Sequence, residues 1–241
     1  MIIQSKENKK IKYINKLRNN KFMNEERKFI VEGFHLIEEA YNAGILLETI
    51  SVDELDYNVP NVLVTQNIMN YISVLPSSSN AIGICKFTEE KKIGNKVIVL
   101  DNLQDPGNIG TIIRSANAFN FDTIVLSDTS VNKYNDKLIR ASQGMLFKTN
   151  VITRNLVDFL NTAKEENYKI CITDVTDGKK INTIKNEDKV IIVMGNEGQG
   201  VSDYVRNYAD TNIYIPMNST CESLNVAVAT SIIMYELNKE D

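Results

Sequence analysis

Five continuous apolar runs in the second half of the chain constrain its fold more than any other feature. They are KVIVLDN, DTIVLSD, KICITDV, KVIIVMGN and TNIYIP, at residues 96–102, 122–128, 169–175, 189–196 and 211–216. The runs do not alternate apolar and polar residues, and a helical pattern separates each from the next. Such strands are typical of a parallel sheet with helices on both faces. We therefore expect the second half to be a parallel α/β domain.

The first 90 or so residues predict a second, smaller α/β unit. Ile11, Ile14 and Leu17 recur at three-residue spacing among lysines, which indicates an amphipathic helix with one buried stripe. The pattern then alternates, with strands at 28–33, 48–53, 61–65 and 81–87 and helices at 66–73 and at 34–44, which Gly44 closes. The polar segment TEEKKIGNK, residues 88–96, is the expected linker. We predict domains at 1–95 and 96–241.

Composition and the chain start predict a cytoplasmic globular protein. The 241 residues are 43% hydrophobic and 24% charged, which is typical of a folded chain. No stretch approaches the roughly 18 apolar residues that a membrane span needs. The first residues, MIIQSKENKK, carry a charge by position six and lack the apolar region of a secretory signal. We expect no membrane partner.

Cysteine and histidine offer no metal site. Cys85, Cys171 and Cys221 are odd in number and far apart, which predicts small core or site-lining thiols rather than disulfides or zinc ligands. The single histidine, His35, lies in the apolar helical run FHLIEEA, which favours a packed or capping role over a catalytic one. We expect no metal cofactor.

The charge distribution leaves two interpretations of the N-terminus open. A net charge of -4 and a pI near 5.3 argue against a nucleic-acid partner, because phosphate binding usually depends on a basic surface. Nine lysines and arginines nevertheless lie within the first 28 residues, with three glutamates among them. They form either a solvated helix face or an N-terminal arm that grips phosphates.

Three segments place glycine and small polar residues at the carboxyl end of a predicted strand, where open α/β sheets bind ligands. They cover residues 100–119, 190–202 and 213–232. In the first, Pro106 and Gly107 predict a turn, and Asn108 can cap the helix that follows. Arg114, farther along that helix, either serves a site or extends to solvent.

The second and third segments also allow a functional and a structural interpretation. Gly195, Gly198 and Gly200 surround Glu197, so that backbone could approach a ligand while the carboxylate accepts a hydrogen bond. A simple turn before a helix at Ser202 accounts for the same pattern. In the third segment, Ser223 caps the helix that opens there, or Ser223 and Asn225 together supply a polar pocket.

Together the three segments resemble, in order and spacing, the three motifs of the SpoU/TrmH branch of the SPOUT superfamily of RNA ribose methyltransferases. The likeness spans residues 96–238, and the sequences that carry it are PGNIGTIIRSANAF, VMGNEGQGVS and IPMNSTCESLNVAVA, with NDKLIRASQGMLFKTNV between them. The N-terminal sequence IVEGFHLIEEA resembles the small ribosomal-protein-like RNA-binding domain often joined to this catalytic domain.

The resemblance implies a fold, a cofactor and an assembly. The fold is an α/β domain with a deep trefoil knot, which general rules of chain connection would not predict. The cofactor is S-adenosylmethionine, held in a bent shape by the knotted loops. The active site is completed across a homodimer, and the apolar helix VAVATSIIMYEL, residues 226–237, also indicates such an interface.

The resemblance also implies roles for individual residues. The expected cofactor contacts, made largely through backbone groups, are Gly195, Ile215, Leu224 and Asn225. The expected catalytic positions are Asn108, Arg114, Glu197, Ser223 and Asn225. Three residues depart from the family pattern outside these positions. They are Asn120, Asn132 and Ala227, where glycine, aspartate and serine are usual.

The implied activity is methylation of a ribose 2′-hydroxyl in structured RNA. Ribosomal RNA is preferred to transfer RNA, because the N-terminal domain resembles those of members that act on ribosomal RNA. Arg114 is the family's proposed activator of the hydroxyl, but a guanidinium with a pKa above about 12 is a poor base. Stabilisation of the developing alkoxide is therefore an equal alternative.

Other activities stay open beside it. The chain could be a catalytically inactive RNA-binding or assembly factor of the same fold. It could also methylate a base, or a ribose in another context such as transfer RNA.

Overall fold

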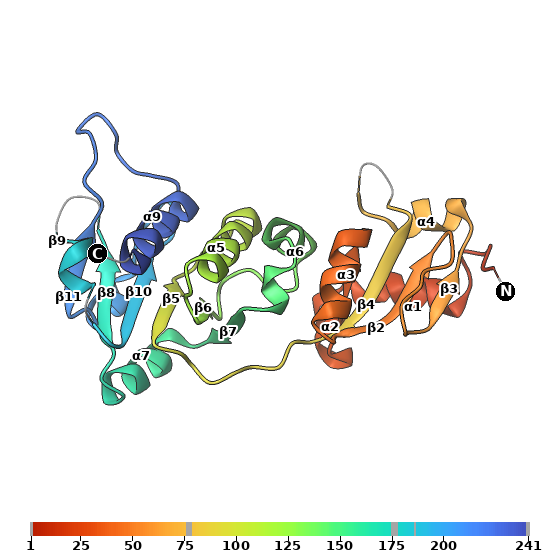
Figure 1. Cartoon of the computed structure of the whole chain (residues 1–241), viewed down its shortest axis with the longest axis horizontal. Helices are drawn as coiled ribbons and strands as arrows, with labels where there is room; N and C mark the ends of the chain where they lie inside the picture. The colour runs from red at the N-terminus through yellow and green to blue at the C-terminus, as the bar shows by residue number, and fades with distance from the viewer. Residues whose placement is uncertain (1, 76–78, 175–177, 186, 240–241) are drawn as a thin grey trace. The chain divides into compact units, whose positions relative to one another are not determined.

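The computed structural model describes residues 2–75, 79–174, 178–185 and 187–239 (Figure 1). The chain divides into two compact units, Met1–Glu89 and Glu90–Asp241, and the division falls inside the segment 88–96. Among the described residues, no helix combines the length and the apolar character needed to cross a membrane.

The first unit is a four-stranded sheet with the order β1-β4-β2-β3. Strand β4 is antiparallel to β1 and β2, whereas β2 and β3 are parallel. All the strands and helices predicted for this unit are present, and one further helix, α2, was not predicted. The elements are α1 (Lys9–Leu17), α2 (Asn20–Glu26), β1 (Lys28–Glu32), α3 (Phe34–Asn42), β2 (Leu46–Ser51), β3 (Asn61–Leu63), α4 (Gln66–Ile72) and β4 (Ala81–Lys86).

The amphipathic stripe of α1 belongs to the core of the first unit. Ile11, Ile14 and Leu17 have no exposed surface and pack with Ile68 of α4 and with the sheet, so the predicted stripe is confirmed. Burying three such side chains contributes about 1.5 to 3 kcal/mol each. The basic N-terminal segment is therefore part of the fold rather than a detachable arm.

The second unit is a seven-stranded sheet with the order β7-β6-β5-β10-β8-β11-β9, in which every strand pairing is parallel. The predicted parallel sheet is thus confirmed, although the edge strands β7 and β9 were not predicted, and residue 175 of the predicted strand 169–175 lies outside the described residues. The strands are β5 (Lys96–Leu100), β6 (Thr123–Ser127), β7 (Asn150–Arg154), β8 (Lys169–Thr173), β9 (Lys179–Lys180), β10 (Val190–Met194) and β11 (Thr211–Tyr214).

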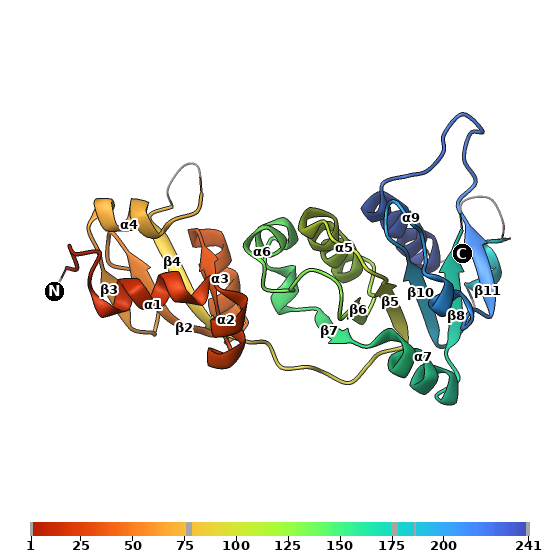
Figure 2. The same cartoon turned by 180° about the vertical axis from the view of Figure 1, so that it is seen from behind.

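Helices cover both faces of this sheet, as Figures 1 and 2 show. Val97 and Val99 of β5 pack in one cluster with Leu156, Phe159 and Leu160 of α7. The other face carries α5, α6 and α9. Because both faces are buried, the central strands need apolar residues at successive positions. The helices are α5 (Pro106–Ala118), α6 (Asp136–Ser142), α7 (Leu156–Glu165), α8 (Asp203–Arg206) and α9 (Val226–Asn238), with short 3₁₀ turns at Met145–Phe147 and Ile181–Ile184.

Two predicted helix caps are wrong. Asp105, not Asn108, caps α5, and its Oδ1 accepts the Asn108 N–H at 2.8 Å. Pro106 takes the first helical position, which places the cap one residue earlier. At α9 the cap is Asn225 rather than Ser223, because the Asn225 Oδ1 accepts the N–H groups of the second and third helical residues at 2.9 and 3.3 Å.

The histidine and cysteines have different surroundings. His35 is exposed in the first turn of α3 and makes no capping hydrogen bond, so the predicted packed or capping role is wrong. Cys85 and Cys171 are buried core thiols, as predicted, and burial raises the pKa of Cys171 to about 12. Cys221 is exposed in the segment before α9.

Candidate active site

A cavity of about 580 Å³ opens at the carboxyl ends of β8, β10 and β11. Parallel strands bring their carboxyl ends to one edge of the sheet, so segments far apart in the sequence meet there. The cavity walls include all four predicted cofactor residues, which are Gly195, Ile215, Leu224 and Asn225.

The loop after β10 forms one wall and folds back on itself. Asn196 and Gly200 exchange two backbone hydrogen bonds, of 3.0 and 2.8 Å. A Cβ atom on Gly195 would lie 2.1 Å from the Gly200 carbonyl carbon and 2.2 Å from the Val201 nitrogen. The loop's own backbone therefore requires glycine at 195. The sequence interpretation, that this glycine makes room for a ligand, missed that reason.

Two anchors hold this loop against the end of β5. The Asn196 Nδ2 donates to the Asn102 carbonyl oxygen at 3.0 Å. The Ser202 N–H and hydroxyl both donate to the Asp101 Oδ2, at 2.8 and 2.7 Å, and Asp101 is only 1% exposed. Sequence analysis missed Asp101 and Asn196. A carboxylate directly after a buried strand was the available signal.

A chain of polar side chains joins the three sequence motifs. The Asn108 Nδ2 donates to the Glu197 Oε1 at 2.8 Å, and the Asn225 Nδ2 donates to the Asn108 Oδ1 at 3.1 Å. Ser223 lines the same cavity, and its side chain is exposed. The structure thus brings four of the five predicted catalytic residues to one edge of the sheet.

Asp105 keeps the first turn of α5 in position for Asn108. The Lys137 ammonium lies 2.8 Å from its carboxylate and, together with the Asn108 backbone N–H, lowers the pKa of Asp105 below its ordinary value. An ionised cap accepts a stronger hydrogen bond from the helix N-terminus.

Arg114 does not join this group. It lies six residues after Asn108 on α5, which turns it about 240° around the helix axis. Its side chain is exposed and does not line the cavity, and it has no hydrogen bond or ion pair among the described residues. Within one copy of the chain, the predicted activator is therefore separate from the other four residues.

Two further charged residues, Asp174 and Arg206, line the cavity without having been predicted. The Arg206 Nη1 donates to the Asp174 Oδ2 at 3.1 Å, and its Nε donates to the Val201 carbonyl oxygen at 3.0 Å. Arg206 therefore ties the loop after β10 to the end of β8. Nothing in the segment VSDYVR distinguishes this arginine from a surface residue.

In the described part of the chain, no group of three or more His, Cys, Asp or Glu side chains could hold a metal ion.

Both units of the chain are similar to known protein families. Residues 95–235 match the SpoU rRNA Methylase family, and residues 8–85 match the MRM3-like substrate binding domain. The 23S rRNA (guanosine(2553)-2′-O)-methyltransferase RlmP of Bacillus subtilis is 33% identical, and the match covers 98% of each chain.

Solved structures share the fold of both units. A putative RNA methyltransferase of the TrmH family from Porphyromonas gingivalis has a TM-score of 0.84 at 26% identity, over 94% of this chain and 95% of that one. An AdoMet-bound rRNA methyltransferase from Sinorhizobium meliloti has a TM-score of 0.87 at 24% identity, over 98% and 97% of the two chains. The expected fold class, a knotted SPOUT α/β domain with a smaller N-terminal α/β unit, is confirmed. The chain belongs to the SpoU rRNA methylase family.

Proposed function

We propose that this protein transfers a methyl group from S-adenosylmethionine to a ribose 2′-hydroxyl of ribosomal RNA. One observation carries the proposal. The Asn225–Asn108–Glu197 chain links all three motifs beside a cavity at the carboxyl edge of a parallel sheet. This edge is where ligands of open α/β sheets bind.

The cavity suits a molecule with a nucleoside part and a charged amino-acid part. Its volume of about 580 Å³ lies in the usual range for small-molecule sites. Ile215 and Leu224 supply apolar surface for a base, and Thr173 and Asp174 supply acceptors for ribose hydroxyls. We assign Gly195, Ile215, Leu224 and Asn225 to cofactor binding. The bound cofactor would supply an electrophilic methyl group on a sulfonium.

In the reaction, the methyl group would pass from the cofactor sulfur, which would become a neutral thioether, to the ribose oxygen, and the hydroxyl proton would pass to solvent. We assign Asn108, Glu197, Ser223 and Asn225 to holding the ribose in line with the methyl group, at about 3 to 3.5 Å. We assign stabilisation of the developing alkoxide to Arg114, because its guanidinium is a fixed positive charge and a poor base.

Ribosomal RNA is the favoured substrate, since the relative with 33% identity is named for methylation of 23S rRNA. We propose residues 1–95 as the RNA substrate-binding domain and 96–241 as the catalytic domain, acting in the cytoplasm, where ribosomal RNA would be encountered. In the N-terminal basic segment, Lys10, Lys12 and Lys28 pair with glutamates, whereas Lys9 and Lys16 are exposed with no carboxylate partner among the described residues. Only part of that segment is therefore available to phosphates.

The test of the proposed function is methyl transfer from tritiated S-adenosylmethionine to total RNA, counted separately for ribosomal and transfer RNA. We expect label in the ribosomal fraction, and mass spectrometry of nuclease digests should locate it on a ribose oxygen. Label in transfer RNA would contradict ribosomal RNA as the substrate. Label on a base would contradict the ribose hydroxyl as the methylated group. Cofactor binding by calorimetry without transfer to any RNA would favour the inactive assembly factor.

We also propose that two copies associate through α5 and α9. An apolar groove between these helices is lined by Phe119, Val228, Ile232 and Tyr235. Val228 and Tyr235 are 49% and 50% exposed. Arg114 projects from α5, so a second copy docked on this groove could bring its own Arg114 to the cavity. The separation of Arg114 from Asn108 within one copy supports this arrangement.

Val228→Glu is expected to convert the dimer to a monomer, because a buried unpaired carboxylate opposes association. Light scattering at micromolar concentration should report the change in mass. Val157→Glu on α7 is the matched control, since Val157 is also exposed, at 36%, and lies outside the groove. A monomer mass for the unaltered protein would contradict the proposed dimer.

A further inference from the structure

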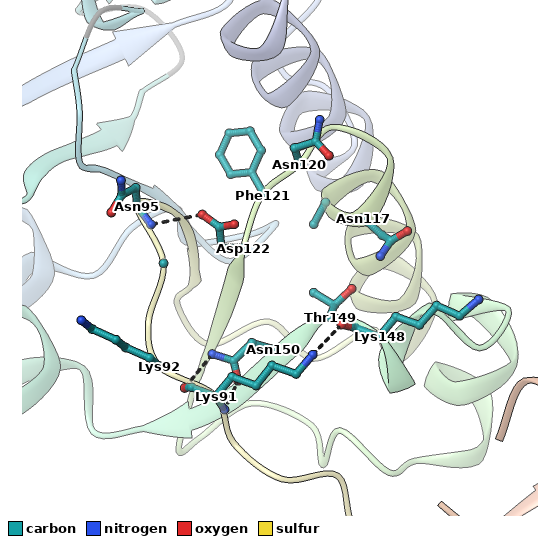
Figure 3. Close-up of a pocket in the computed structure, with 12 residues that line it drawn as sticks. Lys91, Lys92, Asn95, Asn117, Asn120, Phe121, Asp122, Lys148, Thr149 and Asn150 are labelled. Atoms are coloured by element: carbon teal, nitrogen blue, oxygen red, sulfur yellow. Dashed lines mark hydrogen bonds between the residues drawn. The ribbon is translucent and has the colours of Figure 1, made fainter. Parts of the chain in front are cut away.

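A second pocket lies at the opposite, amino-terminal edge of the seven-stranded sheet. It has a volume of about 550 Å³ and lies where β5, β6 and β7 begin, beside the end of α5 (Figure 3). None of its lining residues is among the predicted cofactor or catalytic residues. It is lined chiefly by cationic and amide side chains, among them Lys91, Lys92, Lys148, Asn117, Asn120 and Asn150.

The backbone that carries the lysines is held in place. Asn150, only 5% exposed, accepts the Lys91 N–H at 3.0 Å and donates to the Lys91 carbonyl oxygen at 3.1 Å. The Lys91 ammonium donates to the Lys148 carbonyl oxygen at 3.4 Å. These bonds fix the segment before β5 against β7, so its charges have a defined position.

The charges of Lys91 and Lys92 are available to a ligand. Lys91 and Lys92 are exposed and have no carboxylate partner among the described residues. The single carboxylate in the lining, Asp122, already accepts the N–H groups of Asn95 and Lys96 through Oδ2, at 3.1 and 3.3 Å. In a chain with net charge -4, this concentration of positive charge marks a place for an anion.

Asn120 adds an amide donor to the pocket. Thr149 also lines the pocket, but its hydroxyl is itself buried. Asn120 has a φ of 55°, a left-handed conformation that suits glycine or asparagine. Asparagine in place of the family's usual glycine therefore keeps the turn and contributes an amide to the lining.

The arrangement of the lysines indicates which kind of anion the pocket fits, a polymer or a small ion. In Figure 3, Lys91, Lys92 and Lys148 extend in different directions along the lower rim, whereas Asn117 and Asn120 project from the end of α5. Charges spread along a rim match successive phosphates of a nucleic-acid backbone better than one compact ion. We propose that this pocket binds the sugar-phosphate backbone of the RNA substrate, at a place separate from the methylated ribose. The inference rests on the proposed function, since it takes RNA as the substrate.

The test compares Lys91→Gln/Lys92→Gln with a control, Lys179→Gln/Lys180→Gln. The control removes two adjacent exposed lysines from β9, at the other end of the strand order, and both variants lose the same charge. The probe is a transcript containing the nucleotide that the wild-type protein methylates, with affinity measured by fluorescence anisotropy over a salt series. We expect RNA affinity to fall about tenfold for the pocket variant, and the slope of log affinity against log salt to decrease by about 0.7 to 0.9 for each phosphate that the variant no longer neutralises. The control should stay within about twofold of wild type.

Three measurements keep the outcomes separate. Unchanged melting temperature and S-adenosylmethionine affinity in the pocket variant would exclude misfolding, and Lys91→Arg/Lys92→Arg should retain the wild-type slope. Equal salt slopes for pocket variant, control and wild type would overturn the proposal while leaving wild-type methylation, and hence the proposed function, intact. Inorganic phosphate that binds at the pocket, seen by NMR, without any difference between the RNA slopes would assign the pocket to a free anion and overturn it as well. Absence of RNA methylation by the wild type would refute the proposed function first.

Discussion

Arg114→Ala is expected to lower kcat by a factor on the order of 10² or more, because one positioned charge-stabilising donor is worth about 2.7 to 4 kcal/mol in a transition state. The affinity for S-adenosylmethionine should hardly change, since the residues proposed to hold the cofactor come from the loops after β10 and β11 and not from α5. Single-turnover methyl transfer and calorimetry measure the two quantities separately.

Arg114→Lys tests what the guanidinium does. The lysine keeps a positive charge but lacks the planar fork, so a role in holding phosphate and oxygen together predicts severe loss, whereas a general electrostatic role predicts partial rescue. Light scattering must accompany both variants, because Arg114 lies on α5 beside the proposed dimer groove. Transfer within about twofold of wild type for Arg114→Ala would defeat the catalytic assignment.

Gly195→Ala is expected to weaken S-adenosylmethionine binding about 10- to 100-fold. The added Cβ would lie 2.1 Å from the Gly200 carbonyl carbon. The backbone at Gly200 would therefore have to move away from residue 195, which changes the conformation of the loop after β10. Overpacking of this kind costs about 1 to 3 kcal/mol, and each 1.4 kcal/mol is tenfold in affinity. Calorimetry with the cofactor measures the effect.

Gly198→Ala is the matched control for this loop. The nearest atom to a Cβ at 198 is the Asn196 Oδ1, at 3.6 Å, so the substitution fits without movement. We expect its cofactor affinity to stay within about threefold of wild type. Similar affinities for both variants would mean that the backbone of 195–201 does not form the binding wall.

The strands that could be predicted from the sequence are those buried on both faces, because such burial requires a continuous run of apolar residues. The central strands β5, β6, β8 and β10 are covered on both faces and therefore read as continuous apolar runs. The edge strand β7 was missed because its sequence, NVITR, mixes apolar with polar residues and its last two positions are not buried. An edge strand pairs with a neighbour on one side alone and is less covered, so it needs fewer apolar residues.

The sequence named residues for the candidate site but could not predict their geometry. Motif likeness gave Asn108, Glu197 and Asn225, and the structure joins them by hydrogen bonds. The six-residue spacing puts Arg114 on another side of α5 from Asn108, but it could not show which side of the helix faces the cavity. Asp105 takes the cap in place of Asn108, because Pro106 occupies the first helical position.

The anchors at Asp101 and Asn102 bear on the entropy of cofactor binding. They fix both ends of the loop 196–202 to the end of β5 before any ligand arrives. Ordering a residue costs about 1 to 2 kcal/mol of backbone entropy, and in this loop much of that cost is met during folding rather than during binding. Because β5 leads directly into the turn before α5, the loop and the helix that carries Asn108 share one rigid support. A ligand that contacts the loop would therefore meet the residues proposed to position the ribose on a support that is already ordered.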